Sequence, residues 1–174
     1  MRLFGITALA ISIAAAADTA SAVEEKEKHS EYELFAEDMA YWGYTWEPIK
    51  VKTDDGYILT TFRITGRIGH HVEPDPSLNP IVAMHGLACD ATSWVGIGER
   101  DFEPLVFRLF NRGFDVYLAS NRGTKYCQEH ESLTIEDPEY WAFSWAEMGH
   151  QDDVKNIEMI KERTGKKVSY IGVS

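Results

Sequence analysis

In KKVSYIGVS, residues 166–174, an apolar run leads directly into a glycine, a valine and a serine. Residues 168–171 predict a strand, and a strand that enters Gly-x-Ser is the setting in which a sharp turn exposes a nucleophilic serine. Gly172 removes a side chain that would crowd this turn, and the strained backbone would lift the hydroxyl of Ser174 above the sheet. Ser174 is therefore the candidate nucleophile, and an ordinary serine is the alternative.

Upstream of this stretch, strand-like and helix-like segments alternate. Continuous apolar runs predict strands buried on both faces, and apolar residues spaced three and four apart predict helices. The predicted order is strand 80–84, helix 102–111 with Gly113 as its cap, strand 114–119, a helix that begins at Asp152 and Asp153 and ends at Gly165, and strand 168–171. The two acidic residues would suit the positive end of a helix dipole. This order indicates an α/β protein with a mostly parallel sheet and crossover helices.

An antiparallel hairpin is predicted before the parallel strands. Residues 49–53 and 57–65 have β-branched or alternating character, and the DDG turn at 54–56 is a strong hairpin signal, because glycine accepts a positive φ. The segment YELFAEDMAYWGYTW, residues 32–46, begins like a helix, and we expect its aromatic side chains to pack on the sheet and not to form an apolar entrance. Residues 66–80 have no period and are expected to be a surface connection.

The first predicted parallel strand ends at an HGL motif. Reactive groups in such sheets gather just past the carboxyl ends of the strands, and here Gly86 lets the chain turn sharply. The backbone N–H of Leu87 would then point into the crevice, where it can serve as one donor of an oxyanion hole. His85 is expected to shape the loop and not to act as the base. The alternative is an ordinary strand-to-helix turn.

The second predicted parallel strand is followed by SNRGTKYCQEH, for which we expect a scaffold role. Asn121 and Gly123 suit a tight turn, and Arg122 could hold a loop carboxylate or face water. Cys127 is not expected to be a nucleophile, since no partner can be assigned to it. The sequence has one other cysteine, Cys89, and two buried thiols are expected, with a bridge between them as the alternative.

The first 22 residues have the features of a secretory signal peptide. Arg2 precedes an uncharged, small and apolar stretch at residues 3–17, and the triplet ASA at 20–22 would suit a signal peptidase. A membrane anchor is the alternative, but about 15 residues fall short of the roughly 20 needed to span a bilayer. We therefore expect a signal peptide at 1–22, a flexible arm at 23–31, a partial domain at 32–174 and no transmembrane segment.

The charge of the chain argues against nucleic acid as a partner. It has 17 Lys and Arg against 28 Asp and Glu, a formal net charge of −11, whereas phosphate binding requires a basic face. No cofactor or metal is expected either, because His70 and His71 are neighbours in a surface connection and no further ligand can be assigned to them. The acidity itself is explained by solubility and names no substrate.

Taken together, these residues resemble the N-terminal portion of the acid lipases, the group of gastric and lysosomal acid lipases and sterol ester hydrolases. The matching segments are TDDGYILTTFRI, MHGLACDATSW, LASNRGTKYCQEH and, above all, EYWAFSWAEMGHQDDVKNIEMIKERTGKKVSYIGVS. The last segment resembles the family's run from a Phe-Trp-x-Phe-Ser-x-x-Glu-Met block through an Asp-led helix to Gly-x-Ser-x-Gly. The resemblance covers roughly residues 41–174 in order and without large gaps.

This resemblance implies the α/β-hydrolase lipase fold and a serine esterase that cleaves triglycerides or sterol esters through an acyl-serine intermediate. The implied site residues are Ser174 as nucleophile, the N–H of Leu87 as oxyanion donor and, in support, His85, Gly86 and Gly172. The implied partners are a lipid ester and the lipid–water interface, in a secreted or lysosome-like compartment. The alternatives are a hydrolase of other specificity and a non-catalytic secreted module that uses residues 41–46 to bind lipid or protein.

One departure from the family bears on activity. The family is more than twice this length, and its acid and histidine follow the serine, whereas all six histidines here precede Ser174. We expect a sequence cut at the nucleophile turn, with an unprotected edge strand, and a chain that alone is inactive and insoluble or molten. A rearranged triad with His85 or His150 is the alternative.

Overall fold

The computed structural model describes residues 30–96 and 102–174. The predicted signal peptide at 1–22 therefore lies outside the described residues. Within the described part of the chain, no helix is long and apolar enough to cross a membrane.

The chain divides into two units, Met1–Glu33 and Leu34–Ser174. In the first unit, the short 3₁₀ helix η1 (Ser30–Tyr32) is described. The last two residues of the predicted flexible arm at 23–31 are therefore helical, because a serine followed by an acidic residue favours a helix start. The second unit contains the sheet and all the candidate site residues.

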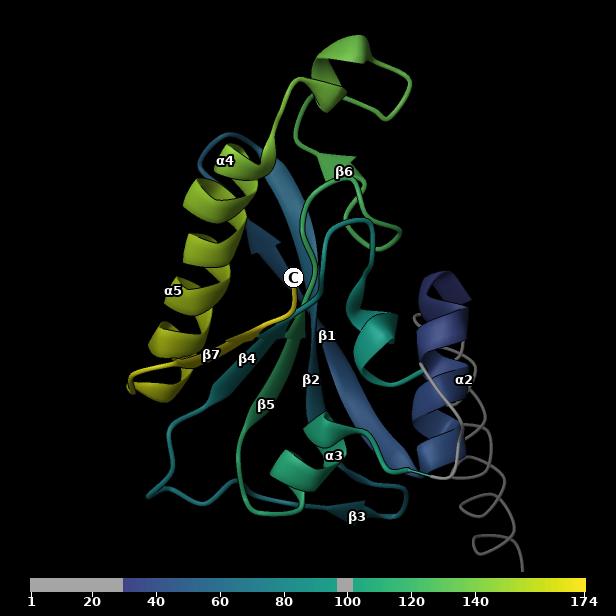
Figure 1. Ribbon diagram of the computed structural model, residues 1–174, viewed down its shortest axis with the longest axis vertical. Coiled ribbons are helices and arrows are strands. Elements are labelled where there is room, and N and C mark those ends of the chain that lie inside the picture. The colour runs from purple at the N-terminus through teal and green to yellow at the C-terminus, as the bar shows by residue number, and fades with distance from the viewer. Residues whose placement is uncertain (1–29, 97–101) are drawn as a thin grey trace, which may run out of the picture. The chain divides into compact units, whose positions relative to one another are not determined.

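One sheet organises the second unit (Figure 1). Among the described residues it has seven strands in the order β1-β2-β5-β4-β7, with β3 and β6 paired to β2 outside this path. The strands are β1 (Tyr44–Lys52), β2 (Tyr57–Arg67), β3 (His70–His71), β4 (Ile81–Met84), β5 (Val116–Ala119), β6 (Glu129–His130) and β7 (Ser169–Gly172). β1 is antiparallel to β2, and β4 is parallel to both β5 and β7. The predicted hairpin followed by parallel strands is confirmed.

The opening hairpin is longer than the sequence indicated. Gly56 forms the predicted turn with φ +97°, but β1 begins at Tyr44, five residues before the predicted run. Pro48 lies inside β1, where its missing N–H is tolerated because β1 is at the edge of the strand path. The predicted surface connection at 66–80 also contributes β3, which pairs with the end of β2 because glycine at 66 leaves room for it.

The first crossover helix is shorter than predicted, since α3 (Leu105–Phe110) replaces the expected helix 102–111. Pro104 precedes it in an extended conformation, with φ −52° and ψ 148°, and a proline disfavours helical backbone at the residue before it. Phe102 is therefore outside the helix and 79% exposed, although its spacing suggested a buried face. Gly113 has φ +91° and donates its N–H to the last turn of α3, as the capping prediction requires.

The second crossover helix begins earlier than predicted. It consists of α4 (Trp145–Glu147), the π-helical segment η4 (Met148–Asp153) and α5 (Val154–Thr164). Its start is a capping box, in which Ser144 and Glu147 exchange hydrogen bonds. The prediction that Asp152 and Asp153 begin the helix is wrong, because this capping signal lies upstream of them. The end at Gly165, with a left-handed φ of +68°, is where the sequence placed it.

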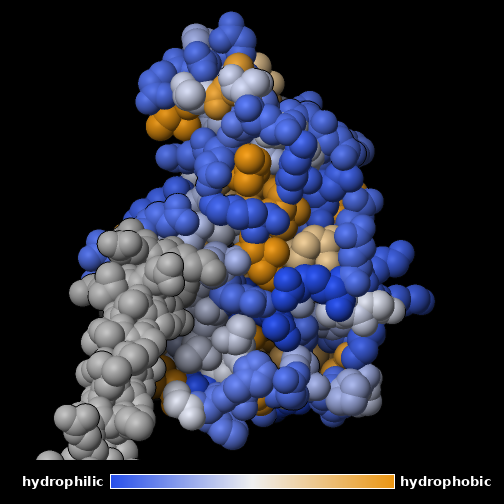
Figure 2. Space-filling view, turned by 180° about the vertical axis from the view of Figure 1, so that it is seen from behind, coloured by the Kyte–Doolittle hydropathy of each residue, from blue (hydrophilic) through white to orange (hydrophobic). Residues whose placement is uncertain are grey.

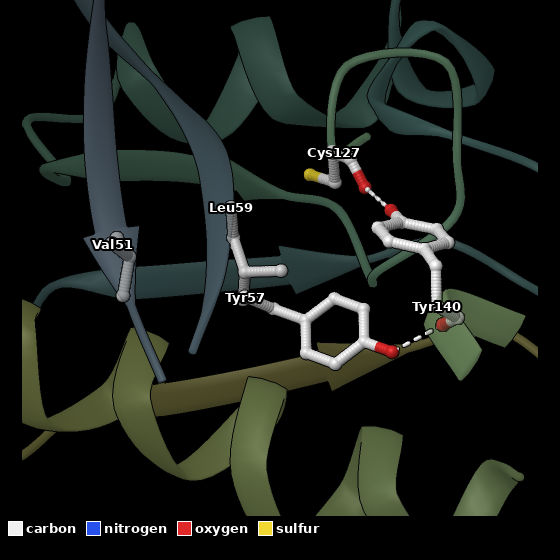
Figure 3. Close-up of a cluster of buried hydrophobic side chains, with 5 residues drawn as sticks. All are labelled: Val51, Tyr57, Leu59, Cys127 and Tyr140. Carbon is white, nitrogen blue, oxygen red and sulfur yellow. Dashed lines mark hydrogen bonds between the residues drawn. The ribbon is translucent and has the colours of Figure 1, made fainter. Parts of the chain in front are cut away.

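On one face of the sheet, α5 covers the parallel strands (Figure 1). The core cluster there consists of Val82, Met84, Tyr117, Ala119 and Ile160. A second cluster, which Met159 of α5 also contacts, consists of Val51, Tyr57, Leu59, Cys127 and Tyr140 (Figure 3). Residues of the hairpin and of the parallel strands are thus fixed against the same helix.

On the opposite face, aromatic side chains dominate the packing of α2 (Glu33–Trp42) and α3. Phe35 stacks on Phe62 of β2 with 4.0 Å between ring centroids, and Tyr44 stacks on Phe107 of α3 at 4.1 Å. Phe35 and Tyr44 are buried. The packing role predicted for the aromatic segment is confirmed at these residues.

Candidate active site

The chain reaches Ser174 at the carboxyl end of β7, beside the end of β4. Parallel pairing sets Gly172 opposite Met84, and the Val173 N–H donates to the Met84 carbonyl at 3.3 Å. Ser174 has φ +54°, in the left-handed region that residues other than glycine seldom adopt. Such a residue costs about 1–3 kcal/mol and persists only where its surroundings fix it. Backbone strain is therefore located at the residue that the sequence marks as the nucleophile.

The loop after β4 lies directly against this turn. A Cβ added to Gly86 would stand 3.0 Å from the carbonyl oxygen of Val173 and 3.5 Å from Cβ of Ser174. Glycine at this position therefore lets the two backbones approach each other. Leu87, the predicted oxyanion donor, comes next in the chain, and Ala88 follows with the positive φ of +60°. The structure thus brings together two strand ends that the sequence singled out separately.

A crevice of about 620 Å³ lies at these strand ends, a volume within the range of small-molecule sites. Its lining residues are Met84, His85, Leu87, Asn121, Trp145, Met148, Gly149, Asp153, Tyr170, Gly172, Val173 and Ser174. Several of its apolar side chains face solvent: Leu87 is 70% exposed, Trp145 78% and Val173 52%. The serine therefore lies in a cleft whose exposed rim is largely apolar.

His85 is buried and links the two loops behind the crevice. Its Nε2 accepts a hydrogen bond from the Asn121 N–H at 3.2 Å, and its Nδ1 lies 2.8 Å from the Gly86 carbonyl oxygen. A ring that accepts at Nε2 and donates at Nδ1 is a neutral imidazole with both nitrogens engaged. This geometry suits the loop-shaping role predicted for His85.

Sequence reasoning missed the polar side chains of η4 and β7 that line the crevice. The hydroxyl of Tyr170 donates to Oδ2 of Asp153 at 3.1 Å. Burial raises the pKa of Asp153, and burial together with the Asp153 carboxylate raises the pKa of Tyr170. The sequence predicts only a helix-start role for Asp153, and no short motif marks the pair, because the two residues come from different elements.

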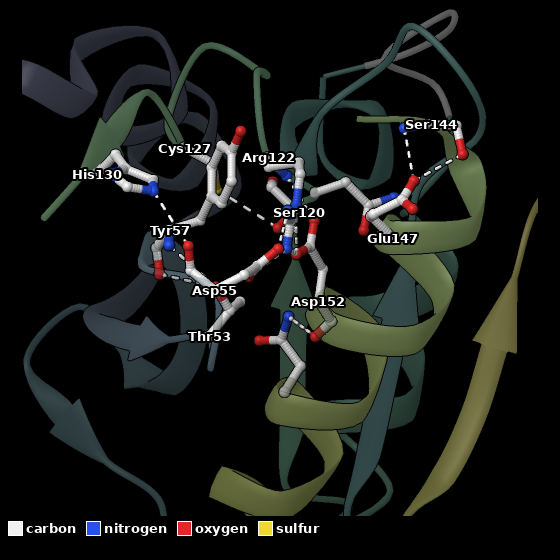
Figure 4. A network of polar contacts seen from close by, with 12 residues as sticks. Thr53, Asp55, Tyr57, Ser120, Arg122, Cys127, His130, Ser144, Glu147 and Asp152 are labelled. Atoms are coloured by element: carbon white, nitrogen blue, oxygen red, sulfur yellow. Dashed lines mark hydrogen bonds and ion pairs between the residues drawn. The ribbon is translucent and has the colours of Figure 1, made fainter. Parts of the chain in front are cut away.

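Behind the crevice, Arg122 forms a buried ion network (Figure 4). Its guanidinium is 1% exposed and makes two hydrogen bonds to Asp55, at 2.6 and 3.0 Å. Asp152, which is fully buried, binds both Nε and the backbone N–H of Arg122 at 2.8 Å. The Tyr57 ring lies under the guanidinium at 3.9 Å. Of the two roles open to Arg122, holding a loop carboxylate is the one observed.

Burial and the contacts of this network together shift the pKa values of Arg122 and Asp55. Burial alone would lower the pKa of Arg122, but hydrogen bonds and ion pairs with Asp55 and Asp152 raise it above its ordinary value. Burial opposes ionisation of Asp55 too, but hydrogen bonds from Arg122 and Thr53 hold its pKa below the ordinary value. The guanidinium therefore remains charged and joins the hairpin turn, the loop after β5 and η4.

Comparison with known proteins shows which family the chain resembles. Residues 35–98 match the family described as the partial alpha/beta-hydrolase lipase region. The chain is 40% identical over 138 residues to gastric triacylglycerol lipase of Bos taurus, a match that covers 78% of this chain and 34% of that protein. It is 36% identical over 141 residues to human lysosomal acid lipase/cholesteryl ester hydrolase, covering 80% and 34%. The chain therefore resembles the gastric and lysosomal acid lipases over most of its own length.

The chain spans about a third of the length of the curated relatives it matches. Among solved structures, it resembles an esterase of Pyrococcus furiosus with a TM-score of 0.50 and 14% identity, covering 77% of this chain and 42% of that one. A likeness at this identity concerns the fold alone. The predicted α/β-hydrolase fold is confirmed.

The two cysteines of the chain, Cys89 and Cys127, are free. Cys127 is buried, as expected, but the expectation of a second buried thiol is wrong, because Cys89 is exposed on the loop after β4. Burial raises the pKa of the Cys127 thiol to about 12, so it is not a thiolate nucleophile.

The neighbouring histidines His70 and His71 form β3 and are exposed. His71 lies 2.8 Å from a carboxylate oxygen of Glu73. In residues 30–96 and 102–174, no group of three or more His, Cys, Asp or Glu side chains is placed to hold a metal ion.

Proposed function

We propose that this chain supplies the nucleophile and part of the oxyanion hole of a serine lipase. The observation that carries the proposal is the left-handed φ of Ser174 at the end of β7, in contact distance of the loop that holds Gly86 and Leu87. The names of the relatives include triacylglycerol lipase and cholesteryl ester hydrolase, so we propose lipid carboxylic esters as the substrate class.

The proposed reaction begins with attack of the Ser174 hydroxyl oxygen on the ester carbonyl carbon. A base takes the serine proton, the carbonyl becomes a tetrahedral oxyanion, and its collapse expels the alcohol, which takes up the proton. Water then attacks the acyl-serine, releases the acid and restores the hydroxyl. The Leu87 N–H would stabilise the oxyanion, and loss of one such donor typically costs about 10²–10³ in rate.

The base of this reaction does not come from His85 in our proposal. Both of its ring nitrogens are engaged, by Asn121 and Gly86, so neither is free to take the proton of Ser174. His150 is exposed on η4 and is not among the residues that line the crevice. We propose that the base and its acid come from the part of the family's length that this chain does not span, and that the chain alone does not hydrolyse esters.

The rim of the crevice supports a lipid–water interface as the setting of the reaction. Leu87, Trp145 and Val173 are all more than half exposed around Ser174. On the face shown in Figure 2, apolar side chains form patches among hydrophilic ones, as is usual for a protein surface. Exposed apolar side chains around a reactive serine would meet acyl chains. In line with the gastric and lysosomal relatives, we propose a secretory or lysosome-like location.

A chimera tests this proposal. In it, Ser174 is followed by the portion of bovine gastric lipase that comes after its matched segment, which would supply the missing base, acid and second oxyanion donor. The readout is hydrolysis of tributyrin and of a cholesteryl ester. We expect activity in the chimera, none in the chain alone, and none in the chimera with Ser174→Ala.

Folding of the chimera and of its Ser174→Ala variant is compared by circular dichroism and thermal unfolding. A folded Ser174→Ala chimera that still cleaves esters would show that another residue is the nucleophile. A folded but inactive parent chimera would reject the proposed function for this chain.

A further inference from the structure

The turn that carries Ser174 must be fixed by its surroundings, because its backbone is strained. Gly86 approaches the turn from the β4 side. On β7 itself, the ring of Tyr170 folds over Gly172: a Cβ added to Gly172 would lie 2.9 Å from Cε1 of Tyr170 and 3.7 Å from its hydroxyl oxygen. The ring therefore occupies the space that any larger residue at 172 would need.

The hydroxyl of Tyr170 ties this ring to the second crossover helix. It donates to Oδ2 of Asp153, the last residue of η4, at 3.1 Å. Asp152, the residue before Asp153, is bound to the buried guanidinium of Arg122. The acceptor of the Tyr170 hydroxyl is therefore held on backbone that the ion network already fixes.

We propose that Tyr170 and Asp153 are positioning residues that hold the turn on which Ser174 lies. The proposal rests on the proposed function, because it takes Ser174 as the group that must be positioned. Neither side chain acts on the substrate. The ring restrains the backbone at Gly172, two residues before the serine, and the Asp153 carboxylate restrains the ring.

The protonation states suit such a contact. Burial and the nearby carboxylate raise the pKa of Tyr170, so its hydroxyl keeps its proton and remains a donor. Burial raises the pKa of Asp153, but a protonated carboxyl group still offers an acceptor oxygen. The hydrogen bond is therefore available to both forms of Asp153.

Amide hydrogen exchange in the folded chimera with bovine gastric lipase tests the proposal without any requirement for catalytic activity. The reporter is the Val173 amide, which donates to β4, and the reference is the Ala83 amide in the middle of β4. Tyr170→Phe keeps the ring and removes the hydrogen bond, so we expect Val173 to exchange about three- to tenfold faster, with Ala83 unchanged. Asp153→Leu should have the same effect, and Asp153→Asn, which keeps an acceptor oxygen, a smaller one.

A double-mutant cycle tests the ring itself. Gly172→Ala places a Cβ against Tyr170, so it should accelerate exchange at Val173 in the parent chimera and do so less in the Tyr170→Ala background. Additive effects would overturn the claim that the ring restrains Gly172. Unchanged exchange at Val173 in Tyr170→Phe, or equal acceleration at Val173 and Ala83, would overturn the positioning role.

The chimera with bovine gastric lipase supplies a second readout. Tyr170→Phe should lower its kcat about three- to tenfold and leave KM unchanged, because the turn and not the binding surface is affected. An equal rise in KM with constant kcat would contradict the proposal. If the chimera is inactive while Val173 responds in the exchange experiment, the proposed function fails and the positioning contact stands. If the chimera is active but exchange at Val173 does not change in the variants, the proposed function stands and the positioning role of Tyr170 and Asp153 fails.

Discussion

The crevice at Ser174 and the ion network around Arg122 are neighbouring regions of the molecule. Two pairs of consecutive residues have one member in each region. Asn121 lines the crevice, whereas Arg122, the next residue, is 1% exposed in the network. Asp152 is fully buried against Arg122, whereas Asp153, again the next residue, lines the crevice. Each region is thus one peptide bond away from the other at two separate places.

The two regions differ in how far their side chains have partners within the protein. In the network, Arg122 is held by two carboxylates and by an aromatic ring, all within hydrogen-bonding or contact distance. In the crevice, apolar side chains are exposed and Ser174 has a strained backbone. A buried ion pair adds little net stability compared with apolar packing, so we infer that the network serves to hold the hairpin turn, the β5 loop and η4 in fixed positions.

Loss of Arg122 should therefore have the largest effect of all. Arg122→Ala leaves the fully buried Asp152 without its partner, and removal of one member of a buried pair typically costs about 3–5 kcal/mol. Urea unfolding measures the free energy of unfolding. The matched control is Arg163→Ala, which removes a surface pair with Glu47 that is about 40% exposed and should cost no more than about 1 kcal/mol.

Equal losses of unfolding free energy in Arg122→Ala and Arg163→Ala would contradict the claim that the network holds the hairpin turn, the β5 loop and η4 in fixed positions. If Arg122→Ala does not fold at all, Arg122→Lys provides the measurement, because it keeps the charge but loses the two-pronged geometry and should still destabilise more than the control.

An extra methyl group at Gly86 should have the next largest effect. Its Cβ would stand 3.0 Å from the Val173 carbonyl oxygen, so the oxyanion loop and the nucleophile turn must separate. We expect Gly86→Ala to lower kcat/KM of the chimera by about 10²-fold, because small displacements of catalytic groups are costly.

A matched control for this variant is Gly165→Ala at the end of α5. Gly165 has a positive φ of +68°, so an alanine there should lower the free energy of unfolding by about 1 kcal/mol. Gly165 precedes β7 and is not among the residues that line the crevice, so its substitution should leave kcat/KM unchanged. A Gly86→Ala chimera as active as the parent would contradict the placement of the oxyanion loop.

The smallest effect concerns the pH dependence contributed by Asp55. Its pKa is lowered in the folded chain, so its contribution is present above the unfolded pKa of about 3.9 and is lost as pH falls through the folded pKa. Urea unfolding at pH 7 and pH 3 should show the advantage of the parent over Asp55→Asn shrinking by no more than about 1 kcal/mol, because the side chain is 36% exposed and screened. Asp54→Asn, at the adjacent exposed carboxylate, should show no comparable change.

The sequence predicted the fold well because its signals were local. The Asp-Gly turn before Tyr57, the apolar runs of the parallel strands and the glycine at 165 each act through neighbouring residues. The errors had local causes as well. Pro104 delays the start of α3, and the capping box at Ser144 starts the second crossover helix before the acidic pair.

In the candidate site too, the residues that belong to local motifs could be predicted, and the contacts between different elements could not. The motifs around Gly86 and Ser174 could be found because each is a short strand-to-turn pattern, and the parallel register then brings them together. The partners of Arg122 and the contact between Tyr170 and Asp153 could not be found, because each joins residues of different elements. A side chain's partner across a fold leaves no periodic signal in a single sequence.

The most direct test of Ser174 as the nucleophile is to identify the residue that a fluorophosphonate labels in the chimera with bovine gastric lipase. The labelled protein is digested, and the modified peptide is sequenced by mass spectrometry. We expect one label per chain, on Ser174, and no label in the folded Ser174→Ala chimera. A label on any other residue, or one that persists after Ser174→Ala, would contradict the claim that the strained turn at the end of β7 presents the nucleophile.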